Sequence, residues 1–451
     1  MLHVEEEEVR LHLLEGNFGL EKESLRVLGD GSFAHTEHPF PEDNYIVCDF
    51  SENQSEINTG VHKSASGAMR ELKEHHDRLI RALQARPQKE YLWPSSNPAF
   101  IRDEDDIPIA LFAGRHVSKT KYREYLSDKY GRYKMTFSGI HVNYSFSEEL
   151  VRIDYGFRGP AERNLSLREY RDRLYLYLAQ GLVSYGWILV MLTAASPVMD
   201  SSYYEKGVYG GDVFTGMASV RCSELGYWNA FAPLFDYSDI QRYADSMESY
   251  VRRGILRAPS ELYYPIRLKS SGENSLQRLK ETGVNHIELR MFDLNPLEEA
   301  GLDERDVVFA QLMMIWLACT EREPLTEQDQ VQAVQNYKNA ARYDLKTVKI
   351  VDPSGESALA VDEAARVIEE MLTFFRALPE GHDPAGTDTP SFPESSSDET
   401  TIERIEEVLW FEYRKITEPE NRYAWQLRER WKDGFVSGAL ALAKERQDSY
   451  V

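Results

Sequence analysis

The sequence predicts a mixed α+β fold, organised as a single catalytic domain over residues 1–451 with helices around a sheet. Segments in which polar and apolar residues alternate, as in strands, are spread between residues 18 and 296. Segments with helical periodicity separate them. The residues that can carry chemistry lie in these distant strands, so the strands must converge. At about 150 residues per domain the length would also allow three domains.

Helical and strand-like segments are mixed along the first half of the chain. Residues 2–15 are typical of a short acidic helix, and residues 63–86 repeat apolar side chains at helical spacing. Alternation predicts three strands, at about 18–28, 44–57 and 136–146. Two segments are expected to be irregular, the proline-punctuated loop 91–100 and the acidic turn 101–108.

The second half is richer in helices. A long helix is predicted over 165–195, and Pro197 ends it. Three further segments follow, a glycine-rich loop at 206–216, a strand at 285–296 and an apolar helix at about 304–320. Pro, Gly, Ser, Thr and Asp crowd residues 378–400, which predicts a flexible loop or linker before C-terminal helices over 401–451.

The charge balance excludes several classes of protein. With 75 Asp and Glu against 52 Lys and Arg, the formal net charge is −23. Nucleic-acid binding needs a basic footprint, and an amphipathic membrane-surface helix needs a basic face. We therefore expect neither partner. An anionic substrate would have to meet a local positive group or a metal ion.

Cysteine usage and hydropathy indicate the compartment. The three cysteines, Cys48, Cys222 and Cys319, form no CxxC pair, which argues against a cysteine-based zinc site and a disulfide framework. The acidic start of the chain is unlike a targeting peptide. The apolar run 181–198 is shorter than the ~20 residues of a membrane span, so it predicts a buried helix. A cytoplasmic location follows.

Carboxylates recur in the predicted strands. Glu21 and Glu23, in GLEKESLRV, are two residues apart, which places both on one face of a strand. Burying like charges together is costly unless cations compensate, and Mg²⁺ prefers oxygen ligands. His141, in SGIHVNYSF, could add a nitrogen ligand or bind a phosphate. Other strand-like segments carry further acids, namely Asp49, Glu52, Glu56 and Glu288.

A basic residue accompanies the last of these acids. Arg290 follows Glu288 by two residues and shares its face, whereas Leu289 and Met291 take the other. A carboxylate facing a metal beside a guanidinium facing a phosphate suits phosphoryl transfer. The common phosphate-loop, dinucleotide, zinc-protease and serine-hydrolase motifs are absent. Three other arginines could supply anion contacts, Arg26, Arg123 and Arg221.

Each residue also has an ordinary structural interpretation. Glu21 and Glu23 could form the solvated face of an edge strand, and His141 could be a satisfied core histidine. Arg290 could simply pair with a neighbouring acid. Two tyrosines, taken alone, are ordinary half-buried residues, Tyr122 and Tyr227. On the residues alone, both the metal-dependent and the structural interpretations stay open.

Six segments, in this order, resemble the glutamate–cysteine ligase family. They are GLEKESLRV (19–27), DFSENQSE (49–56), KYREYLSDKYG (121–131), SGIHVNYSF (138–146), SVRCSELGYWN (219–229) and IELRMFDLNP (287–296). The similarity is greatest to the bacterial type and to the ligase half of bifunctional glutathione synthetases. The second, ATP-grasp half of those fusions is not in this sequence.

The resemblance implies a glutamine-synthetase-like fold in which a curved antiparallel sheet forms a funnel. It implies ATP-dependent formation of an amide at the γ-carboxylate of glutamate, through a γ-glutamyl phosphate. It assigns two or three Mg²⁺ ions to Glu21, Glu23, Asp49, Glu56, His141 and Glu288. Arg290 would contact the γ-phosphate of ATP. The amino-acid substrates would meet Phe50, Tyr122, Arg123, Arg221 and Tyr227.

The sequence departs from the family pattern beside these segments. Asn97 stands where a methionine is expected, Cys48 where a threonine is common, and Asn58 where the family usually has isoleucine. These changes leave open an acceptor other than cysteine, such as a non-protein amino acid. More distant alternatives are a guanidino-type phosphotransferase and a non-catalytic homologue. The partners expected are small-molecule substrates, and the protein is expected to be a monomer or small homo-oligomer.

Overall fold

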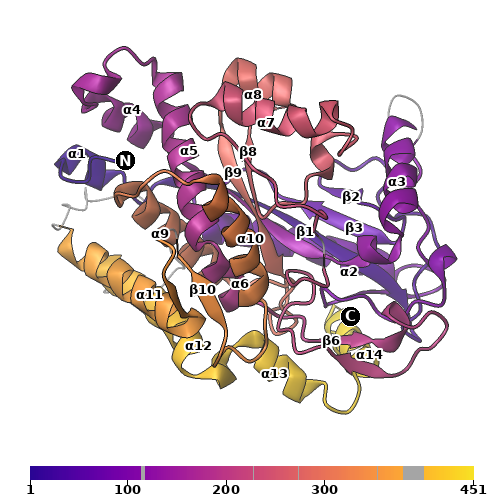
Figure 1. Cartoon of the computed structure of the whole chain (residues 1–451). Helices are drawn as coiled ribbons and strands as arrows, with labels where there is room; N and C mark the ends of the chain where they lie inside the picture. Colours follow the sequence, from indigo (N-terminus) through magenta and orange to yellow (C-terminus); the bar gives the residue numbers. More distant parts are fainter. Residues whose placement is uncertain (113–116, 227, 273, 353, 379–400, 451) are drawn as a thin grey trace.

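A computed structural model describes residues 1–112, 117–226, 228–272, 274–352, 354–378 and 401–450 (Figure 1). The α-helices are α1 (Glu7–Leu11), α2 (Ala65–Gln84), α3 (Val117–Tyr130), α4 (Glu148–Gly156), α5 (Leu167–Tyr185), α6 (Trp187–Thr193), α7 (Ile240–Arg252), α8 (Leu276–Thr282), α9 (Glu304–Cys319), α10 (Glu327–Ala340), α11 (Ala360–Ala377), α12 (Thr401–Thr417), α13 (Tyr423–Arg430) and α14 (Phe435–Asp448). The strands are β1 (Gly16–Leu28), β2 (Ile46–Cys48), β3 (Gln54–Asn58), β4 (Glu90–Leu92), β5 (Gly139–Phe146), β6 (Val198–Asp200), β7 (Asp212–Phe214), β8 (Ile266–Lys269), β9 (His286–Asp293), β10 (Lys349–Val351) and β11 (Ser357–Leu359).

An antiparallel seven-stranded sheet organises the molecule, and the predicted α+β class is confirmed. Six strands follow the order β2-β3-β1-β5-β9-β8, and β4 pairs with the end of β1. All of these pairings are antiparallel. Strands from residue 16 to residue 293 therefore meet side by side, as the spread of the motifs requires (Figure 1).

The two faces of β1 have opposite character. Phe18 and Leu20 are buried in the main apolar core, whereas Glu21 and Glu23, which follow them, face the other side. Helix α2 packs on β1 and β4, while α5 and α6 pack on β8 and β9. Lys22 shares the core face and is buried there, where burial and the nearby Arg446 lower its pKa to about 7.

Two predicted elements are interrupted in the structure. The strand expected at 44–57 is a hairpin of β2 and β3, with a turn between them that carries Asp49. The helix expected over 165–195 breaks at Gly186 between α5 and α6. A Cβ atom at Gly186 would lie 2.0 Å from the hydroxyl oxygen of Tyr337, so only glycine leaves room there for the α10 side chain.

The C-terminal helices pack against the rest of the fold. Helix α12 contacts α9 and α11, and α14 contacts α2, β4 and β6 (Figure 1). The ammonium of Lys415 in α12 lies 2.6 Å from Asp306 Oδ1 in α9 and 2.9 Å from Glu412 Oε2, all three being buried. The three helices agree with the prediction for 401–451. Residues 379–400, the main part of the predicted linker, lie outside the described residues.

Within the described part of the chain no single helix has the length and apolarity of a membrane span. Among the described residues, only α5 and α6 combined reach that length and apolarity, and the two helices are bent by 56° relative to each other.

Candidate active site

Glu21, His141 and Glu288 come together on the polar face of the sheet. Strand pairing sets Glu21 opposite His141, and Glu288 lies on the next strand, opposite Asn143. His141 Nδ1 lies 3.0 Å from Glu21 Oε2 and 3.7 Å from Glu288 Oε1. Potential ligand atoms of the three residues all lie within 4.8 Å of one another. Two carboxylates and one imidazole at this spacing could bind a divalent cation.

A second group of acids adjoins the first. Glu23 pairs across the ladder with Glu56, and its Oε1 lies 3.9 Å from His141 Nε2. The backbone N–H of Gly139 donates to Glu23 Oε2 at 3.0 Å. Burial and the nearby Asp49 raise the pKa of Glu23 to about 8, although Arg221 and Arg290 oppose the shift. Burial and Asp49 likewise raise the pKa of Glu56 well above its ordinary value.

Two basic side chains lie beside Glu288, on the side of the acidic cluster away from Glu23 and Glu56. Arg290 Nη1 donates to Glu288 Oε1 at 3.0 Å, and Lys269 Nζ lies 3.4 Å from the same oxygen. Burial alone would raise the pKa of Glu288, but Arg290 and Lys269 hold it well below its usual range. Glu288 is therefore ionised, and its buried Oε2 has no hydrogen-bond partner among the described residues. A free buried carboxylate oxygen of this kind is suited to binding a cation.

Burial and Arg290 lower the pKa of His141, so its imidazole is neutral at pH 7. A neutral ring keeps a nitrogen lone pair for a metal. Asn143, two residues further along β5, donates to Glu21 Oε1 at 3.0 Å and orients that carboxylate.

A β-bulge distorts β9 beside these residues. The register shifts between Ile140 and Val142, so that Arg290 and Met291 together oppose the single residue His141. Leu289 faces the core, as strict alternation predicts. Met291 is buried in the same main apolar core as Leu289, and it also borders, with Arg290, Arg221 and Cys222, one cavity of about 60 Å³.

The expected substrate residues surround the acidic face. Arg221 Nη2 donates to the backbone oxygen of Arg290 at 2.7 Å, and Arg123 Nε donates to that of Asp49 at 2.6 Å. The Tyr122 hydroxyl accepts a hydrogen bond from Ser260 at 3.0 Å. Phe50, next to Asp49, is buried in an apolar cluster against which Tyr122 packs. Tyr227, the remaining candidate, lies outside the described residues.

Arg26 is not an anion-binding residue. It is fully buried and donates to Glu90 Oε2 at 2.5 Å and to the backbone oxygens of Thr36 and Glu52. These partners occupy the guanidinium in a structural role, because a buried charge must be paired. The sequence showed its charge but not its burial.

Two of the residues that differ from the family pattern, Asn97 and Cys48, point away from the acidic face. Asn97 is buried and its amide donates to the backbone oxygens of Ser196 and Val198, at 2.9 and 2.8 Å. It therefore joins the loop after β4 to the start of β6. Cys48 pairs with Ser55, one step from the pair of Val47 and Glu56, so its side chain points away from the acidic face.

Three residues of the site were missed by the sequence reasoning: Asn143, Arg267 and Lys269. A signal for each existed. Asn143 is two residues from His141, so the period of a strand places both on one face. Arg267 and Lys269 alternate with apolar residues in IRLK, and β8 pairs Arg267 with Glu288. The sequence could not show which strand lies beside β9.

The fold and these contacts define an acid-lined sheet site with guanidinium groups at one end, suited to a cation-assisted reaction of an anionic substrate. The family model described as glutamate–cysteine ligase matches residues 1–255 and 232–340. The chain therefore belongs to the glutamate–cysteine ligase family.

Individual relatives agree with this assignment. The glutathione biosynthesis bifunctional protein GshAB of Listeria innocua is 32% identical over 98% of this chain and 55% of its own length. That of Clostridium perfringens is 30% identical over 99% of the chain and 56% of its own length. The chain thus spans about half the length of the curated relatives it matches.

Solved structures show the same fold. A bifunctional glutathione synthetase from Pasteurella multocida matches with a TM-score of 0.80 and 26% identity, over 99% of this chain and 54% of that one. A glutamate–cysteine ligase from Francisella tularensis, solved in complex with AMP, matches with a TM-score of 0.80 and 21% identity, over 97% and 89%.

The close approach of Arg221 to β5 generates a prediction. A Cβ atom at Gly139 would lie 2.3 Å from Arg221 Cζ, whereas one at Gly19 would make only ordinary contacts at 3.7 Å. We expect Gly139→Ala to lower the free energy of unfolding by about 1–3 kcal/mol through overpacking, and Gly19→Ala to change it by less than about 1 kcal/mol. Urea denaturation measures both, and equal midpoints for the two variants would contradict the described packing.

Proposed function

We propose that the protein ligates the γ-carboxylate of L-glutamate to the amine of L-cysteine, using ATP and passing through a γ-glutamyl phosphate. The observation that carries this proposal is the pairing of the Glu21, His141 and Glu288 cluster with Arg290, 3.0 Å from Glu288. Membership of the glutamate–cysteine ligase family supports the same chemistry. The free state of all three cysteines agrees with a reducing cytoplasm.

The carboxylates would hold Mg²⁺. Glu21, His141 and Glu288 would form one site, while Glu23, Glu56 and Asp49 would supply further oxygen ligands. Bound Mg²⁺ would neutralise phosphate charge and align the γ-phosphoryl group for in-line transfer. Two features fit this role: the unpartnered buried Oε2 of Glu288, and the raised pKa of Glu56, which burial and repulsion from neighbouring acids cause.

The protein side chains would position the reactants. Arg290 would contact the γ-phosphate, and its pairing with Glu288 keeps the guanidinium in place before substrate binds. Tyr122, Arg123 and Arg221, with Phe50 and Tyr227, would form the amino-acid pocket. Holding the acyl phosphate beside the amine makes the second step effectively intramolecular, and exclusion of water prevents hydrolysis of the intermediate.

Cysteine is the favoured acceptor among the alternatives. Asn97 and Cys48, two of the departures that raised another acceptor, point into structural contacts rather than toward the acidic face. A γ-glutamyl ligase for a different amine keeps the same site and differs only in the pocket around Tyr122 and Arg221.

The experiment is product analysis with glutamate, Mg-ATP and a panel of amines. We expect cysteine to support ADP release with formation of γ-glutamylcysteine in equal amount, measured by coupled assay and mass spectrometry. Preference for another amine would assign a different acceptor. A stable phosphorylated product without an amide would indicate a phosphotransferase, and absence of ADP release with every amine would contradict a ligase.

The role of Glu288 generates a second prediction. Glu288→Gln keeps the size of the side chain and removes the charge, so turnover should fall on the order of 100-fold, as for loss of one electrostatic contact to a transition state. The exposed Glu281 of α8 provides the control, because Glu281→Gln makes the same chemical change away from the site. Steady-state kinetics and thermal unfolding measure activity and folding separately. Wild-type turnover in Glu288→Gln would remove this residue from the metal site.

Cation binding should depend on pH. In the metal-free protein the pKa of Glu23 is about 8, so Glu23 carries a proton at pH 7, and the raised pKa of Glu56 makes this carboxyl hold its proton to a higher pH than an ordinary one. Mg²⁺ binds the ionised forms, so binding should release about one to two protons and tighten as pH rises through 8. Calorimetry in two buffers of different ionisation enthalpy measures the release. Glu56→Gln should reduce it, and binding without proton release would contradict these assignments.

A further inference from the structure

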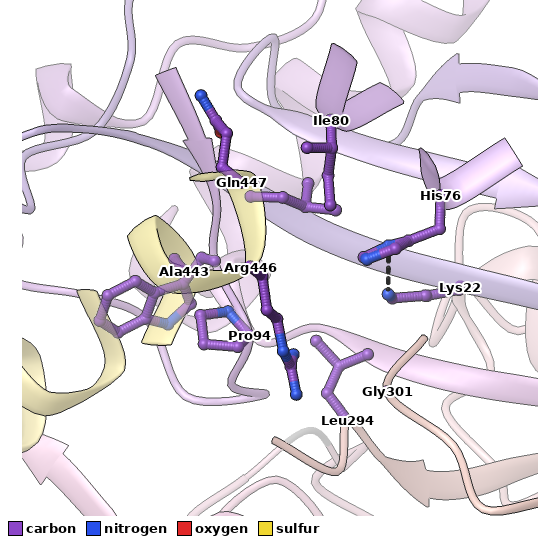
Figure 2. A pocket seen from close by; sticks show the side chains of 11 residues that line it. Lys22, His76, Ile80, Pro94, Leu294, Gly301, Ala443, Arg446 and Gln447 are labelled. Atoms are coloured by element: carbon purple, nitrogen blue, oxygen red, sulfur yellow. Dashed lines mark hydrogen bonds between the residues drawn. The ribbon is translucent and has the colours of Figure 1, made fainter. Parts of the chain in front are cut away.

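A small cavity lies behind the acid-bearing strand, on the core side of the sheet. Its wall combines Lys22 of β1, His76 of α2, and Arg446 and Gln447 of α14 with apolar residues. Lys22 stands between Glu21 and Glu23 in sequence, and strand alternation turns it to the opposite face. Figure 2 shows Lys22 and His76 on one side of the cavity and the α14 residues on the other.

The polar atoms around this cavity are mostly unused donors. The Lys22 ammonium has three N–H groups, and within the described residues its one hydrogen-bond partner is His76 Nδ1, at 3.0 Å (Figure 2). Because Nδ1 accepts that bond, the proton of the neutral imidazole lies on Nε2, which is buried without a partner. The amide nitrogen and the amide oxygen of Gln447 are also buried without a partner, so this side chain offers the cavity donors as well as an acceptor. His76 is 3% exposed and Gln447 is 1% exposed.

The charge of the wall is one-sided. Lys22 and Arg446 are the basic residues of the wall, and no Asp or Glu lines the cavity among the described residues. The two acids whose charge acts on Lys22, Asp77 and Glu299, bind Lys73 at 2.7 and 3.0 Å. Arg446 donates to the backbone oxygens of Pro296 and Glu298, which are neutral acceptors. Buried cations and free donors without an acid create a site for an acceptor that carries negative charge.

We propose that this cavity binds one small monovalent anion, with chloride as the physiological occupant. Its volume of about 10 Å³ accommodates a single water-sized body. Phosphate, sulfate and carboxylates are too large. The anion would receive hydrogen bonds from Lys22 and His76 and would offset the charge of Arg446, thereby joining α2 and α14 to the back of the strand that carries Glu21 and Glu23. The proposal is independent of the reaction catalysed on the other face.

Bromide provides a direct test on the wild-type full-length protein. Crystals soaked in bromide should show an anomalous peak in the cavity, within hydrogen-bond distance of Lys22 Nζ. In solution, chloride or bromide should raise the Tm by about 1–3 °C relative to gluconate at equal ionic strength. Gluconate serves as the reference because it cannot enter a cavity of this size.

A pair of variants separates the site from general salt effects. Lys22→Met should abolish the halide-specific rise in Tm, whereas Lys432→Met, which removes an exposed lysine of equal charge, should retain it. If Lys22→Met does not fold, bromide diffraction on the wild type still decides. A cavity that holds only water, or a bromide peak without any halide-specific shift in Tm, would overturn the proposal.

Discussion

Repulsion among carboxylates gathered on one face of the sheet is the constraint on which the rest of this structure depends. The backbone ladder holds Glu21, Glu23 and Glu56 close together, whatever their charge, because β1 pairs directly with β3 and β5. At the β9 end, Arg290 and Lys269 stabilise an ionised Glu288. At the β3 end, burial and the neighbouring Asp49 raise the pKa of Glu56 well above its ordinary value. The face is thus polarised before any substrate or cation binds.

Much of this arrangement could be predicted from the sequence, because strand alternation is a local property. Glu21 and Glu23, like Glu288 and Arg290, are two residues apart, so their shared face follows from the pleat alone. Their convergence could be expected from the spread of acids over distant strands, and the resemblance to a family implied the particular ligand set. The register that sets Glu21 opposite His141 depends on which strands become neighbours, and that choice is made by the packing of the whole core.

The remaining differences have the same origin in distant contacts. The helix expected over 165–195 breaks at Gly186, where the hydroxyl of Tyr337, about 150 positions later in the sequence, occupies the space of a Cβ atom. Arg26 resembled an anion ligand because its partner Glu90 lies on a strand whose pairing with β1 has no local signal. An arginine and a glutamate have the same composition in a structural ion pair as in an active site, so only the three-dimensional environment of the pair distinguishes the two roles.

The bulge at His141 has a consequence for how this segment can vary. Before the bulge Ile287 and Leu289 face the core, and after it Phe292 and Leu294 do, so the strand changes from odd to even positions along its length. Point substitutions on either side can be absorbed one at a time. A single-residue insertion or deletion cannot be absorbed in this way, because it would reverse the faces of all side chains on one side of the change. Either the core leucines or the pair of Glu288 and Arg290 would then lie on the wrong face of the sheet. Among related chains the number of residues between Ile287 and Leu294 should therefore vary less than their identity.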